Sequence, residues 1–125
     1  MASILRVDTL TDASSNNSTA MSTINQGTAK AWANLNGSTF GLRDNFNVGS
    51  ATDNGTGDYT FTFSSGLANT NYSAVVSSDD SGSSRAFAQC KTYATSSFVA
   101  ITKRGDTGAT IDKDIVVAAV QGDLA

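Results

Sequence analysis

The chain has no histidine, no proline and a single cysteine among its 125 residues. Without histidine it lacks the commonest general base, the commonest zinc ligand and every Ser-His-Asp arrangement. Without proline, its turns must be made by glycine, asparagine and aspartate. Because Cys90 is alone, no internal disulfide can form, which indicates assembly in a reducing cytosol.

Charge is also scarce, and this narrows the classes of partner. Charged residues make up 15% of the chain, and eight Lys and Arg against eleven acidic residues give a net charge of -3. A phosphate backbone requires a basic stripe, whereas here the only tight basic pair, Lys103-Arg104, is offset by Asp106. The longest apolar run, Ile115 to Val120, has the length of a strand and not of a membrane span. We therefore expect neither nucleic-acid binding nor membrane insertion, and the first fifteen residues do not resemble a secretory signal.

The polar stretch "ATDNGTGDYTFTF", residues 51–63, is the strongest candidate for a ligand loop. A phosphate loop must lead into a helix, but this one leads into an alternating segment typical of a strand. Asp53, Asn54 and Asp58 offer oxygen ligands for calcium, yet the EF-hand spacing is absent. The pattern favours a turn at Asn54-Gly55 that feeds a core strand. The side chains expected on the inner face of that strand are Tyr59, Phe61 and Phe63.

The remaining candidates for chemistry are weak. Asp79 and Asp80 are adjacent, so their carboxylates point to opposite sides of an extended chain and do not form a catalytic pair. Asp112 and Asp114 are interpreted as the solvated start of a strand, and Cys90 has no histidine to activate it. We expect no catalytic residue, no metal ligand, no cofactor and no enzymatic activity.

Alternating patterns separated by turn signals predict about seven strands and no convincing helix, which is typical of an all-β, antiparallel β-sandwich. Residues 29–36 alternate a face of Ala and Leu with a lone Trp32 on the other face. The alanine face packs closely against either the facing sheet or a second chain. Asn36-Gly37 predicts a hairpin, and the run Ile115 to Val120 predicts a strand buried on both faces.

The first 28 residues differ in composition from the rest. Residues 3–10 predict an extended segment, and residues 11–28 predict a loop rich in Asn and Ser. The spacing of Met21 and Ile24 would also suit one helical turn, although the composition favours the loop. We therefore divide the chain into an extended N-terminal arm, residues 1–28, and a β-sandwich head, residues 29–125. The arm's expected anchoring residues are Ile4, Leu5, Val7, Leu10, Met21 and Ile24.

Four stretches carry a resemblance to a known family. They are "MASILRVDTL", "STINQGTAKAWANLNG", "LRDNFNVGSATDNGTGDYTFTF" and "NYSAVVSS". Together they resemble the tail-fibre-like, virion appendage module of tailed phages, including phages of aquatic bacteria. The resemblance covers residues 1–10 and 24–76, and the "KAW…NG" and "DNGTGDYT" pieces are specific in combination.

The resemblance implies a non-enzymatic virion structural protein that forms a homotrimer. We expect a small tail- or capsid-associated fibre or decoration subunit, anchored by its arm to capsid, tail or neck proteins and located in the virion after assembly in the bacterial cytoplasm. The alternative is a module that binds a host-surface glycan or receptor. Its contacts would be Asp79, Asp80 and Ser81 in the 79–84 turn, with Trp32 and Tyr93 as aromatic platforms.

Overall fold

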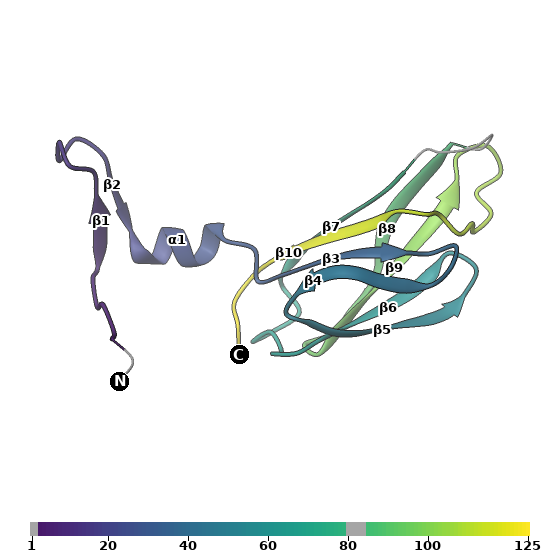
Figure 1. Ribbon diagram of the computed structural model, residues 1–125, viewed down its shortest axis with the longest axis horizontal. Coiled ribbons are helices and arrows are strands. Elements are labelled where there is room, and N and C mark those ends of the chain that lie inside the picture. The colour runs from purple at the N-terminus through teal and green to yellow at the C-terminus, as the bar shows by residue number, and fades with distance from the viewer. Residues whose placement is uncertain (1–2, 80–84) are drawn as a thin grey trace.

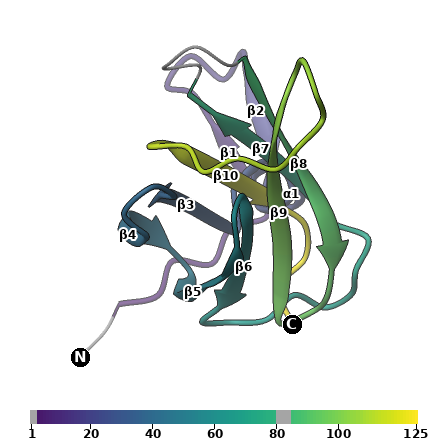
Figure 2. The same ribbon diagram turned by 90° about the vertical axis from the view of Figure 1, so that its right-hand side faces the viewer.

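The computed structural model describes residues 3–79 and 85–125. Its head is built from eight strands in two antiparallel sheets. The first sheet has the order β4-β3-β10-β7 and the second the order β5-β6-β9-β8. Figures 1 and 2 show the sheets as two layers, so the predicted all-β sandwich is confirmed. The strands are β3 (Ala31–Asn36), β4 (Gly41–Phe46), β5 (Val48–Gly55), β6 (Asp58–Phe63), β7 (Ser73–Ser78), β8 (Ala86–Tyr93), β9 (Ser97–Arg104) and β10 (Val116–Gln121).

The head has one strand more than the sequence predicted, because residues 48–55 form β5 instead of belonging to a turn. A single residue, Asn47, separates β4 from β5 and carries the chain from one sheet to the other. Its φ of 54° is a conformation that asparagine tolerates better than most residues. The Asn47 side chain donates to the carbonyls of Lys30 and Ser65, each at 3.0 Å. Hydrogen bonds of the Asn47 side chain therefore stabilise the point at which the chain passes from one sheet to the other.

Large and small side chains are divided between the two sheets in the core. The β5-β6-β9-β8 sheet contributes most of the buried aromatic rings, with Phe61 and Phe98 stacked at 4.9 Å between ring centroids. The β4-β3-β10-β7 sheet contributes small and aliphatic side chains, including Ala31 and Ala33 of β3. The predicted alanine face therefore packs on the facing sheet. Leu67, which follows β6, is also buried.

Two local expectations have different outcomes. The Asn36-Gly37 hairpin is confirmed, since β3 and β4 are antiparallel neighbours and the Thr39 N–H donates to Asn36 Oδ1 at 3.0 Å. The prediction that the run Ile115 to Val120 is buried on both faces is wrong. Although β10 is central in its sheet, its outer face carries Val117 and the exposed Ala119. Within residues 3–79 and 85–125, no second layer covers that face.

The arm projects away from the head (Figure 1). It consists of an extended segment, the hairpin of β1 (Thr9–Thr11) and β2 (Ser18–Ala20), and the short helix α1 (Met21–Gly27). The predicted loop over residues 11–28 and the expectation of no helix are therefore wrong. Asp12 organises the hairpin turn, because its carboxylate accepts hydrogen bonds from Ser14 and Asn17. The spacing of Met21 and Ile24, which suits one helical turn, indicated the helix that the structure contains.

Candidate interaction surfaces

The arm exposes apolar side chains that the head does not cover. Ile4 and Leu5 are 77% and 81% exposed, and Val7 and Leu10 are also exposed. Met21 and Ile24 of α1 are half-buried. The six predicted anchoring residues therefore lie outside the head core, and the first four lie along a segment that is accessible to a partner.

Polar side chains fix the base of the arm to one end of the head. Gln26 of α1 donates to Asp123 Oδ1 at 2.5 Å, and Gln121 of β10 donates to the Gly27 carbonyl at 3.1 Å. Lys30, at the entrance to β3, donates from its ammonium to the backbone of α1. These contacts lie at the surface and set the direction in which α1 leaves the sheet.

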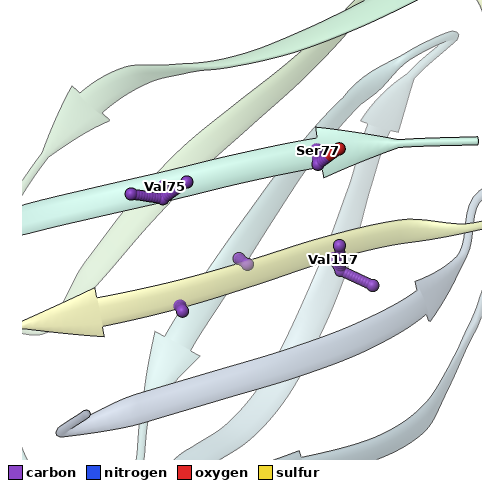
Figure 3. A pocket seen from close by; sticks show the side chains of 5 residues that line it. Val75, Ser77 and Val117 are labelled. Atoms are coloured by element: carbon purple, nitrogen blue, oxygen red, sulfur yellow. The ribbon is translucent and has the colours of Figure 1, made fainter. Parts of the chain in front are cut away.

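The outer face of the β4-β3-β10-β7 sheet carries a row of apolar side chains. Phe46, Trp32, Ala119 and Val75 are cross-strand partners on four neighbouring strands, and residues paired in this way share one face of a sheet. Phe46 is 54%, Trp32 39% and Val75 65% exposed. We call these four residues, together with Val117 in the next row, the apolar face. A shallow hollow between Val75 and Val117 marks its aliphatic side (Figure 3).

The sheet beneath the apolar face is almost free of charge. Its four strands contain one cation, Arg43, and one anion, Asp44, both on the edge strand β4. Arg43 reaches over the sheet and donates to Asn34 Oδ1 at 3.3 Å. Depletion of charge around exposed aromatic residues is typical of protein–protein interfaces.

The polar stretch 51–63 forms the β5–β6 hairpin, so it feeds the core strand β6 as the sequence predicted. Its turn is at Thr56-Gly57, not at Asn54-Gly55 as predicted. Asp53 accepts the Gly55 N–H at 2.9 Å, whereas Asp58 forms an ion pair with Lys91 at 2.6 Å. Burial opposes ionisation of Asp58, but its bonds to Lys91 and Asn54 outweigh this and lower its pKa. Among the described residues, no group of three or more His, Cys, Asp or Glu is placed to hold a metal ion.

Asp112 has a role that the sequence interpretation missed. It is not the solvated start of a strand, because it lies before β10 and its Oδ1 accepts two hydrogen bonds. The Gly57 N–H and the Tyr59 hydroxyl each donate to that oxygen at 2.7 Å. Burial and the Asp112 carboxylate both raise the pKa of Tyr59 well above its ordinary value. The arrangement closes the hairpin turn onto the segment before β10, which is a structural role.

The two aromatic residues considered as glycan platforms lie in different sheets. Trp32 lies on the outer face of one sheet, whereas Tyr93 ends β8 of the other sheet and packs against Tyr72 at 5.1 Å. Asp79 accepts the Ile115 N–H at 3.0 Å, which holds the end of β7 to the start of β10. Asp80 and Ser81 lie outside the described residues.

Cys90 is half-buried on the inner side of β8, and burial raises the pKa of its thiol. A raised pKa lowers the thiolate fraction, which is the opposite of what an activated nucleophile requires.

In the part of the chain that the structure describes, no helix has both the length and the apolar character needed to cross a membrane. Comparisons with family models, curated proteins and solved structures found no match to this chain.

Proposed function

We propose that the chain is a non-enzymatic structural subunit of a tailed-phage virion, attached to the particle by its N-terminal arm. One observation carries the proposal. A closed β-sandwich is joined to an arm that projects away from it and leaves Ile4, Leu5 and Leu10 exposed to solvent. These three side chains take no part in the head core, so they are available for another protein.

The energetics of the arm favour docking. Burying one Leu or Ile side chain contributes about 1.5–3 kcal/mol. Several such side chains along one extended segment can therefore offset the cost of ordering that segment on a partner surface. If subunits form the homotrimer implied by the phage resemblance, three arms would bind with an avidity that one arm lacks.

The resemblance of residues 1–10 and 24–76 to phage appendage modules supplies the biological setting. In this setting the subunit is a small fibre or decoration protein on the capsid, tail or neck, assembled in the host cytoplasm. The low charge and the richness in Ser and Thr suit an exposed virion protein.

Particle incorporation tests the role of the arm. Virions are grown in a host that supplies the full-length variant in place of the wild-type chain, and the protein in purified particles is quantified by mass spectrometry. We expect Leu5→Asp to lower incorporation at least tenfold, because it places a charge where apolar burial is required. The control Ser3→Asp adds the same charge at a neighbouring exposed position and should incorporate normally. Normal incorporation of both Leu5→Asp and Ile4→Asp would exclude anchoring by this segment.

Binding of a host-surface glycan is the second candidate function, favoured by the exposed indole of Trp32 beside the polar side chain of Asn34. Aromatic faces stack on sugar rings, and neighbouring amides supply hydrogen bonds. A glycan array would show binding that Trp32→Ala abolishes. An array without any bound glycan would exclude this function.

A further inference from the structure

The apolar face is graded across the sheet. Its central row begins with the two large aromatic side chains, Phe46 and Trp32, and ends with the two smaller ones, Ala119 and Val75. One half of the row therefore stands higher above the sheet than the other. Two such surfaces pack well only when the aromatic half of one meets the aliphatic half of the other.

A rotation axis parallel to the strands produces this match between two copies of the chain. Such a rotation leaves the strands of the two copies parallel. It reverses the order of the strands in the facing sheet, so opposite edges of the two sheets face each other. Phe46 of one copy then faces Val75 of the next, at opposite edges of the sheet. Both a two-fold and a three-fold axis in this orientation bring these edges together.

The position of the charged side chain of Asp44 agrees with an axis parallel to the strands. Asp44 pairs across the sheet with Asn34, in the row that continues through Val117 to Ser77. The rotation that places Phe46 near Val75 also places Asp44 near Ser77, so the two copies of Asp44 do not meet. An axis perpendicular to the strands and parallel to the sheet would instead set β4 on β4 and β7 on β7, so the aromatic half of one copy would meet the aromatic half of the next, and both copies of Asp44 would lie on the two facing β4 strands.

We propose that the apolar face joins copies of this chain, with the Phe46–Trp32 half of one copy packed on the Ala119–Val75 half of the next and with the strands parallel. The inference deepens the proposed function and rests on it, because parallel strands direct all the arms to the same end of the oligomer. The base of α1 lies beside this face, since Gln121, which holds Gly27, is the next outward residue after Ala119 on β10.

The size of the face limits the strength of this contact. Four strands about 4.8 Å apart and about 20 Å long cover roughly 400 Å² on each copy, or about 800 Å² in total. Stable interfaces bury about 1,200–2,000 Å², so the face alone predicts a weak association.

Cross-linking between two full-length variants tests the pairing. Both carry Cys90→Ala, and one carries Phe46→Cys while the other carries Val75→Cys. Facing sheets lie about 10 Å apart, beyond disulfide reach, so a short bismaleimide is used. We expect cross-linked product in the mixture and at least tenfold less with either variant alone. Equal cross-linking of Phe46→Cys alone, or the absence of product in the mixture, would overturn the pairing.

Light scattering of charge variants provides an independent test. Val75→Lys should abolish association of the full-length chain, whereas Thr52→Lys, at an exposed position on the other sheet, should leave it unchanged. Equal masses for Val75→Lys and the wild type would contradict the inference. Because Leu5→Asp should leave cross-linking intact while lowering particle incorporation, failure of the pairing and failure of arm anchoring give different results.

Discussion

Replacing Tyr59 by Phe tests the buried contact that closes the β5–β6 hairpin. Tyr59 is fully buried in the core cluster, and its hydroxyl donates to Asp112 Oδ1 at 2.7 Å. The variant removes only this hydroxyl. Its ring can keep its place beside Phe61 in the core because the two side chains differ by one oxygen atom.

The expected loss of stability follows from the type of bond. A hydrogen bond to a charged group contributes about 1.5–3 kcal/mol, more than a bond between neutral groups. Asp112 keeps the Gly57 N–H as a donor at 2.7 Å, so its carboxylate does not become unpaired. We therefore expect the free energy of unfolding to fall by about 2 kcal/mol. For a domain of this size that corresponds to a melting temperature lower by roughly 8 °C.

Urea unfolding followed by circular dichroism measures this loss, and a double-mutant cycle with Asp112→Ala assigns it. We expect the double variant to be less destabilised than the sum of the two single variants by at least about 1 kcal/mol. The control is Tyr93→Phe, because Tyr93 is exposed and packs against Tyr72, whereas the hydrogen bonds to Asp112 Oδ1 come from Gly57 and Tyr59. A loss below about 0.5 kcal/mol for Tyr59→Phe, or strict additivity in the cycle, would refute a stabilising bond.

Two further predictions concern the same region and the core beside it. Burial raises the pKa of Tyr72 to about 12, and the pKa of Tyr59 is raised further. Each therefore contributes stability that is complete below the unfolded pKa of about 10 and is lost as pH rises toward 12, by up to about 1.4 kcal/mol per pH unit for each tyrosine. Urea midpoints measured from pH 9 to 12, with phenolate absorbance, would show this fall, and a flat profile would contradict it. Gly57→Ala should destabilise the head by about 3 kcal/mol or more, because Gly57 has a φ of 65° and a Cβ would lie 2.6 Å from the Thr102 carbonyl oxygen. Gly41→Ala, which meets no atom within 4 Å, should stay within about 0.5 kcal/mol of the wild type, and equal losses in the two variants would refute the steric explanation.

The fold was predictable from alternation because one face of most strands is buried. In β6, Tyr59, Phe61 and Phe63 alternate with half-buried polar residues, as the sequence indicated. In β5 the signal fails, since only Val48 is buried and the rest of the strand is exposed or half-buried. Its strand conformation comes from pairing with β6, which is tertiary information. A polar edge strand has no periodic apolar signal and therefore looks like a loop in the sequence.

The Asp112 contact could not be predicted for a related reason. Asp112 and Gly57 are 55 positions apart, and nothing local indicates that they meet. The sequence shows Asp112 beside Lys113 and Asp114, which is typical of an exposed segment. One signal in the sequence points to such a contact. The phenol hydroxyl of Tyr59 lies on the buried face of β6, and a buried hydroxyl requires a hydrogen-bond partner.

The position of Trp32 follows from the division of side-chain size between the two sheets. The space between sheets about 10 Å apart is limited, and Tyr59, Phe61 and Phe98 of the second sheet occupy much of it. The first sheet can then contribute only small and aliphatic side chains, so β3 turns its alanines inward. Strand alternation sends Trp32 to the outer face, away from the core. A polar side chain there would keep the same core, so core packing does not require an exposed indole at this position. In the proposed assembly the indole packs on the next copy, so the apolar face and not the core is the place to test for a partner.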